Sequence, residues 1–228
     1  MFLNAISALN GEIVYYRGHK VGSTTILAWM NLVDSSHLRT THPDLYDTNH
    51  WSTNKERTRF YHKDKVELGK KDLVTLPKTH HTSVNGDVFH LPVIPSNNKV
   101  RFCVVRDPVE RFISAFANRA TREKEIQTIE DFINNFDYYF WKHQNIESHF
   151  APLVFNYGLD PSLYTNIYNI NQMSEIKKML ESYSGTLPDI AFNKTEDSVK
   201  QALSLTNDQV AFIKKKYAID YEVFGKWL

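Results

Sequence analysis

The sequence contains a single cysteine, Cys103, so the chain has no partner for an internal disulfide bond. Cys103 lies in an apolar run, and a reducing compartment is the simplest setting for such a protein. Long hydrophobic runs are also missing. No stretch approaches the roughly 18 apolar residues of a membrane span, and the N-terminus has no basic segment leading into an apolar one. We therefore expect a cytoplasmic protein without a membrane span.

The sequence also has no large excess of positive or of negative residues. The 27 Lys and Arg residues nearly balance the 26 Asp and Glu residues, so global charge does not indicate a nucleic-acid partner. Any anion-binding site must therefore arise from local placement. Of the 228 residues, 42% are hydrophobic and 13% aromatic, which is ample for a sizeable core. Because the chain shows no internal repeat and no low-complexity tract, we expect residues 1–228 to form one domain.

Two buried strands are each expected to lead directly into a helix. Residues 12–17, "EIVYYR", are typical of a short buried strand, and the apolar residues after it fall on one helical face: Ile26, Leu27, Met30 and Val33. Residues 99–106, "KVRFCVVR", have the β-branched, apolar character of a strand buried on both faces. A further strand, "LVTLP", is expected at residues 73–77, and residues 85–98 are expected to be irregular.

The second half of the chain is expected to be rich in helices. Helical patterns dominate from Thr128 onward, with one strand-like interruption at residues 163–170, "LYTNIYNI". Strands that alternate with helices indicate an α/β fold whose central, mostly parallel sheet is flanked by helices. Ligands of such folds bind at the C-terminal ends of the strands.

The segment "YYRGHKVGSTTILAWM", residues 15–30, joins the first of these strands to its helix through a loop suited to an anion. Gly18 and Gly22 allow the backbone to approach a ligand closely, and Lys20 brings a positive charge. Three hydroxyl groups follow at the expected helix N-terminus, on Ser23, Thr24 and Thr25. A helix N-terminus with these features favours a bound anion.

The strand at residues 99–106 ends in a tightly specified turn. Asp107 is placed to cap the next helix, Pro108 suits its first position, and Glu110 would complete a capping box. Arg106, at the end of the strand, is placed to grip an anion, although such a triplet taken alone more often marks an arginine paired with a carboxylate. The helix is expected to bury Val109, Phe112, Ile113 and Phe116, leaving Arg111 and the candidate helper Ser114 on its other side.

Together the two motifs resemble those of sulfotransferases. "HKVGSTTILAW" resembles their 5′-phosphosulfate loop, and "VVRDPVERFISAF" is similar to their 3′-phosphate motif, in which an arginine and a serine eight positions later bind the 3′-phosphate. The resemblance is closest to carbohydrate sulfotransferases such as the heparan-uronosyl and chondroitin enzymes. Those relatives are usually Golgi proteins with a membrane anchor and disulfides, neither of which this sequence offers.

The resemblance implies a P-loop-like, three-layer fold and a specific reaction. A sulfuryl group would pass from 3′-phosphoadenylyl sulfate (PAPS) to a hydroxyl acceptor, with a carbohydrate as the expected acceptor and no metal. Lys20 would stabilise the negative charge that builds on the departing phosphate. The donor would be held by Lys20, Val21, Gly22, Ser23, Thr24, Thr25, Arg106 and Ser114, with Lys194 and Thr195 in a segment that closes over the nucleotide in relatives.

An acceptor hydroxyl needs a general base, and His80 and His81 are the candidates. "LVTLPKTHH" is expected to end a strand that lies between the two motifs in the sequence, and strand ends of such folds face the ligand. Histidine suits proton transfer near neutral pH. Histidines in a corresponding stretch are implicated as the base in the heparan-uronosyl relatives. The resemblance does not choose between the two neighbours.

Two rival functions share parts of this pattern. A P-loop nucleotide kinase needs G-x-x-x-x-G-K-[ST], whereas Lys20 precedes Gly22 here. A non-catalytic nucleotide-binding module would keep the donor site but would lack a working base. No zinc site is expected, because the histidines at 37, 42, 50 and 62 lack compact metal-ligand spacing. No motif encodes the identity of the acceptor.

Overall fold

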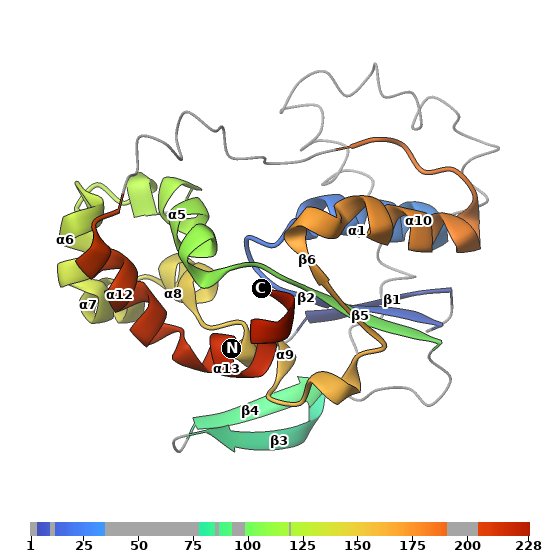
Figure 1. The fold of residues 1–228 in the computed structure, drawn as a ribbon, viewed down its shortest axis with the longest axis horizontal. Coiled ribbons are helices and arrows are strands. Elements are labelled where there is room, and N and C mark those ends of the chain that lie inside the picture. The colour runs from blue at the N-terminus through green and yellow to red at the C-terminus, as the bar shows by residue number, and fades with distance from the viewer. Residues whose placement is uncertain are drawn as a thin grey trace.

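The computed structural model describes residues 4–9, 12–34, 78–84, 87–92, 99–118, 120–190 and 205–228. In this part of the chain a four-stranded sheet carries helices on both faces, and a group of helices packs beside it (Figure 1). Three of the four strands run parallel. The predicted α/β fold with a mostly parallel sheet and flanking helices is therefore confirmed.

The main sheet has the strand order β1-β2-β5-β6. Its strands are β1 (Asn4–Ala8), β2 (Ile13–Arg17), β5 (Val100–Val105) and β6 (Asn166–Asn169). β2, β5 and β6 are parallel, with Tyr16 opposite Cys103 and Val105 opposite Asn169, whereas β1 runs antiparallel to β2. Because β2 and β5 are parallel neighbours, the segments that follow them leave the same edge of the sheet.

The strands predicted at residues 12–17 and 99–106 form as expected. From Ile13 to Tyr16 and from Phe102 to Val105, every side chain is at most 3% exposed, as both faces of the sheet are covered. The thiol of Cys103 is fully buried, and burial raises its pKa well above the ordinary value. It is therefore a core residue with little thiolate character.

Helices α1 (Ser23–Asp34) and α10 (Met173–Ser184) lie side by side over one face of the main sheet (Figure 1). The predicted stripe of α1 is buried, but so are Ala28, Trp29 and Leu32, because both the sheet and α10 cover this helix. Trp29 Nε1 donates a hydrogen bond to Pro188 O (3.0 Å). The short helices α9 (Val154–Tyr157) and α13 (Ala218–Phe224) lie on the other side of the sheet.

A second group of helices has its own aromatic core. It comprises α5 (Pro108–Asn118), α6 (Ile129–Asn134), α7 (Phe136–Lys142), α8 (Gln144–Phe150) and α12 (Asn207–Lys216). Phe112, Phe132, Phe136 and Phe150 meet at its centre, with ring centroids 4.7 to 6.2 Å apart. Short 3-10 turns occur at Ala120–Arg122, Pro161–Leu163, Ile170–Gln172 and Gly225–Trp227. The predicted helix-rich C-terminal half is confirmed.

Residues 78–92 correct the predicted secondary structure. β3 (Lys78–Val84) pairs antiparallel with β4 (Asp87–Pro92) in a separate two-stranded sheet, so the stretch predicted to be irregular contains a strand. Asn85-Gly86, between the two strands in the sequence, is the pair most typical of a two-residue hairpin connection. That signal was available in the sequence. The strand predicted at residues 73–77 lies outside the described residues.

Candidate functional site

The loop between β2 and α1 has a constrained backbone. Lys20 has a φ of 65° and Gly22 a φ of 75°, both in the left-handed region. A non-glycine residue is strained there, and such strain persists where the surroundings hold it, often at ligand-binding sites. A side chain at position 22 would also clash, because an added Cβ would lie 2.9 Å from Ile170 Cδ1. The turn therefore presents Lys20 in a conformation that the rest of the fold imposes.

Two hydroxyl groups lie against Gly18, in the loop between β2 and α1. Ser23 Oγ, at the start of α1, donates to Gly18 O (2.7 Å). Tyr157 Oη donates to Val104 O (2.7 Å), and an added Cβ on Gly18 would lie only 2.2 Å from that hydroxyl oxygen. Burial raises the pKa of Tyr157, which keeps the phenol protonated as a donor. Gly18 is thus required for the loop to pack closely against the Tyr157 side chain of α9.

The side chains of the loop differ in exposure. Val21 is fully buried and belongs to the core, so its side chain is not available to a ligand. Ser23 and Thr25 are 8% and 4% exposed, whereas Thr24 is partly exposed. The amide groups of the first turn of α1 point toward the N-terminal end of the helix, where the helix dipole favours an anion.

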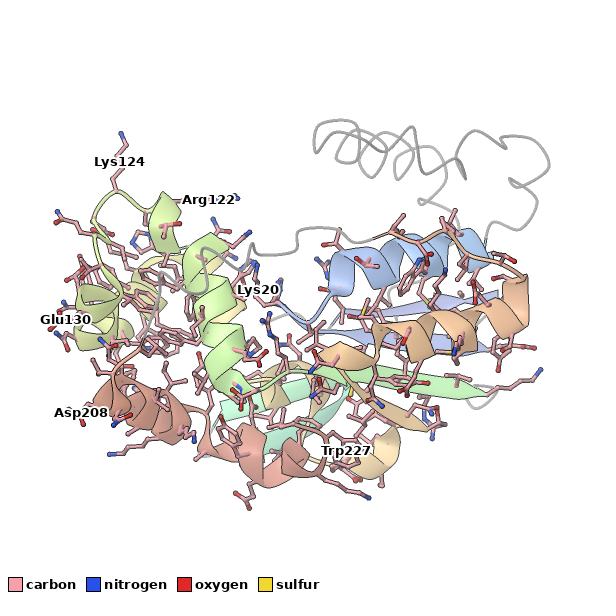
Figure 2. All side chains as sticks on the ribbon, turned by 45° about the horizontal axis from the view of Figure 1, so that its top comes forward. Lys20, Arg122, Lys124, Glu130, Asp208 and Trp227 are labelled. Atoms are coloured by element: carbon pink, nitrogen blue, oxygen red, sulfur yellow. The ribbon has the colours of Figure 1, made fainter. Side chains whose placement is uncertain are left out.

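The structure brings the two predicted motifs together. Arg106 follows β5, and its Nη1 donates to Lys20 O (3.3 Å) in the loop after β2. Figure 2 shows Lys20 between the first turn of α1 and α5. The loop that carries the lysine and the arginine that is predicted to grip an anion therefore form one site at the C-terminal edge of the parallel strands.

The turn between β5 and α5 differs in one detail from the prediction. Asp107 caps α5 as expected, since its Oδ1 accepts from Val109 N (2.8 Å) and Glu110 N (3.2 Å). The Glu110 carboxylate, however, accepts from Arg106 Nε (3.3 Å), so it does not complete the expected capping box. Burial lowers the pKa of Arg106, and Glu110 offsets part of this effect. An arginine remains charged at neutral pH despite such a shift.

The predicted polar side of α5 is buried, which corrects a second expectation. Arg111 is 1% exposed and Ser114 is 4% exposed, while Val109 and Ile113, which were expected in the buried stripe, are only partly buried. Arg111 Nη1 donates to His149 O (3.2 Å) and Nη2 donates to Ala151 O (2.7 Å). The guanidinium finds its partners at the end of α8, so α5 is enclosed on more than one side.

A buried carboxylate from the C-terminal helix completes this cluster. Asp220 Oδ2 lies 3.9 Å from Arg111 Nη2 and accepts from Leu153 N (2.8 Å), and Oδ1 accepts from Val154 N (3.0 Å). Burial raises the pKa of Asp220, and Arg111 and the two backbone donors oppose that rise. The Arg111 guanidinium also lies 5.2 Å from the centre of the Tyr217 ring. No local sequence signal pairs residues this far apart.

The sequence also does not predict an imidazole pair beside Lys20. The rings of His19 and His149 lie 4.5 Å apart, centroid to centroid. His149 Nδ1 is 2.8 Å from Asn145 O, a contact that places the proton on Nδ1. His149 is at the end of α8, and only tertiary packing brings it to the loop.

The candidate bases lie in a different secondary-structure element from the one expected. His80 and His81 lie inside β3, in the antiparallel hairpin, and not at the end of a strand of the main sheet. His80 is opposite Leu91 and His81 opposite His90, with a register shift between Lys78 and His80. Their side chains, and all of Lys194 and Thr195, lie outside the described part of the structure.

The described residues include neither a membrane-spanning helix nor a cluster of metal ligands. No helix in these ranges is long and apolar enough to cross a membrane. No group of three or more His, Cys, Asp or Glu side chains in the same ranges could hold a metal ion.

Comparison with known proteins identifies the class. The model of the sulfotransferase family matches residues 5–153, well over half of the chain and the part that holds both motifs. The chain belongs to the sulfotransferase family and is a PAPS-dependent enzyme. Comparisons with curated proteins and with solved structures gave no match.

Proposed function

We propose that this sulfotransferase transfers the sulfuryl group of PAPS to a hydroxyl group of a carbohydrate, with the donor bound between the β2–α1 loop and Arg106. The main support for this donor site is the hydrogen bond from Arg106 Nη1 to Lys20 O, since it joins the two motifs at one edge of the sheet. A carbohydrate acceptor is supported by the resemblance of both motifs to carbohydrate sulfotransferases.

The residues of the site suit the two anionic ends of the donor. The amides from Val21 to Thr24 and the side chain of the partly exposed Thr24 suit the 5′-phosphosulfate, because a helix N-terminus favours negative charge, whereas Thr25 N already donates to Gly22 O (3.1 Å). Arg106 and Ser114 suit the 3′-phosphate, and the guanidinium is already supported by Glu110. Lys194 and Thr195 are proposed to close over the nucleotide on the strength of the resemblance.

In the reaction, the bond from the donor sulfur to the 5′-phosphate oxygen breaks while the acceptor oxygen bonds to the sulfur. Lys20 is proposed to neutralise the charge left on the departing phosphate. His80 or His81 is proposed to accept the proton of the acceptor hydroxyl. Their support is their place between the two motifs in the sequence, and successive residues of one strand project to opposite faces, so we expect only one of them to act.

The function is tested by incubating the protein with radiolabelled PAPS and a panel of acceptors. The panel contains saccharides with free hydroxyl groups, together with phenols and steroid alcohols of matched concentration. Label is expected in saccharides. Label found only in the phenols or steroids would contradict the proposed acceptor class while leaving the donor assignment intact.

Lys20→Ala should lose far more turnover than affinity for the product nucleotide. A group that meets charge developing on the leaving phosphate acts mainly in the transition state, and loss of one such group costs about 10²- to 10³-fold in kcat. The measurement is single-turnover kinetics beside calorimetry with adenosine 3′,5′-bisphosphate. An equal loss in rate and in affinity would mean that Lys20 only binds the nucleotide.

Arg106→Ala should weaken binding of adenosine 3′,5′-bisphosphate by about 1.5–3 kcal/mol, because a charge-assisted contact is lost. Affinity for 5′-AMP, which lacks the 3′-phosphate, should change little. Arg101→Ala is a matched control, since Arg101 lies near the start of the same strand, at the end away from Arg106, and its Nε donates to Leu163 O (2.6 Å). Unchanged bisphosphate affinity in folded Arg106→Ala would remove Arg106 from the donor site.

A further inference from the structure

We infer that Tyr221 is a positioning residue for the donor site: through Asp107, it holds the β5–α5 turn so that Arg106 keeps its grip on the 3′-phosphate. The inference rests on the proposed donor site and extends it to the C-terminal helix α13. That helix lies beyond residues 5–153, the part that the family model matches.

One hydrogen bond links α13 to the turn. Tyr221 Oη donates to Asp107 Oδ2 (2.9 Å), while Oδ1 of the same carboxylate caps α5 through Val109 N and Glu110 N. Both oxygens of Asp107 are therefore engaged, and its side chain has one orientation. Arg106 precedes Asp107 directly, so a change in this turn moves the backbone from which the guanidinium extends.

α13 is itself firmly anchored, which makes it a suitable support. Asp220, the neighbour of Tyr221, accepts hydrogen bonds from Leu153 N and Val154 N and faces the Arg111 guanidinium. Tyr217, just before the helix, donates through its hydroxyl to Phe150 O. Tyr221 thus reaches Asp107 from a helix whose first turn is fixed to α8 and α9.

The Tyr221–Asp107 contact lies in a partly buried place, where a hydrogen bond to a charged group is strong. Burial and the bond to Asp107 raise the pKa of Tyr221, so its hydroxyl stays a donor at neutral pH. Removing only that hydroxyl frees Asp107 Oδ2 and leaves the ring packing in place. The loss should therefore appear at the 3′-phosphate and not as general unfolding.

The test compares Tyr221→Phe with Tyr217→Phe in the full chain. Calorimetry gives the Kd of adenosine 3′,5′-bisphosphate and of 5′-AMP for each variant, and urea unfolding gives its stability. Tyr221→Phe is expected to weaken bisphosphate binding about three- to tenfold, which is a loss of up to about 1.4 kcal/mol in binding free energy. It should leave 5′-AMP binding unchanged. Tyr217→Phe removes a buried hydroxyl from the same region, so it should lower stability without changing the ratio of the two affinities.

A second comparison tests the route through Arg106. In the Arg106→Ala background, Tyr221→Phe should cause no further loss of bisphosphate affinity, because the group that it positions is gone. The inference would be overturned if Tyr221→Phe alone weakened the binding of both ligands equally or weakened neither. It would also be overturned if Tyr221→Phe caused its full loss of bisphosphate affinity in the Arg106→Ala background. Suppose that the unmodified protein binds the bisphosphate more tightly than 5′-AMP, and that Arg106→Ala abolishes this difference while Tyr221→Phe does not change it. The proposed donor site is then supported, and only the role of Tyr221 is wrong. If the unmodified protein binds the two ligands equally well, the proposed donor site is wrong, and the inference about Tyr221 is wrong with it.

Discussion

Asp220→Asn is expected to lower the free energy of unfolding by about 3–5 kcal/mol, because it leaves the Arg111 guanidinium buried without a counter-charge. Arg111 is 1% exposed and Asp220 is fully buried, so water cannot replace the lost partner. The amide of asparagine would also point a donor at Leu153 N or Val154 N, both of which already donate to Asp220. Urea unfolding monitored by circular dichroism measures the loss.

The matched control is a pair on the surface. Lys216 Nζ lies 2.7 Å from Asp137 Oδ1, and the Asp137 side chain is 72% exposed, so Asp137→Asn should cost at most about 1 kcal/mol. Arg111→Met should destabilise for the same reason as Asp220→Asn, since it leaves the other charge buried. The double variant should be more stable than the sum of the two losses predicts. A loss in Asp220→Asn no larger than in Asp137→Asn would show that the buried pair is not needed for the fold.

Alanine at the catalytic base should lower turnover by about a hundredfold to ten-thousandfold and leave donor affinity nearly unchanged. A general base acts on the proton of the acceptor and does not hold the nucleotide. We therefore expect one of His80→Ala and His81→Ala to show this loss while the other tolerates the change. The rate of the unmodified enzyme should also fall on acidification, because a protonated imidazole cannot accept a proton, and that acid limb should vanish in the impaired variant.

We would measure single-turnover rates of each variant with an acceptor identified in the panel. The Kd of the bisphosphate, measured in parallel, shows whether donor affinity has changed. His90→Ala is the matched control, because His90 lies opposite His81 on the same hairpin and is not a proposed base. Normal turnover in both His80→Ala and His81→Ala would place the base elsewhere. The His19 and His149 rings beside Lys20 would then be the next imidazoles to replace.

Much of the fold follows from local pattern. β2, β5 and α1 were predictable because burial on both faces selects continuous apolar strands, and a helix that packs on a sheet repeats its apolar residues at helical spacing. The Asp107 cap follows equally from residues next to one another in the chain. The β3–β4 hairpin was missed although Asn85-Gly86 signals it, so that error lies in the interpretation and not in the sequence.

By itself the sequence determined the two motifs that we propose bind the donor, the strands and helices that carry them, and, through the parallel sheet, the edge at which Lys20 and Arg106 meet. Only the tertiary structure decided which polar residues of α5 are buried and which part of the chain supports the Arg106 turn. Arg111 pairs with Asp220, and Tyr221 reaches Asp107 across 114 positions. The physical reason is range: periodicity and capping act between residues a few positions apart, whereas a buried charge is satisfied by whichever distant group the packing of the helices brings within reach.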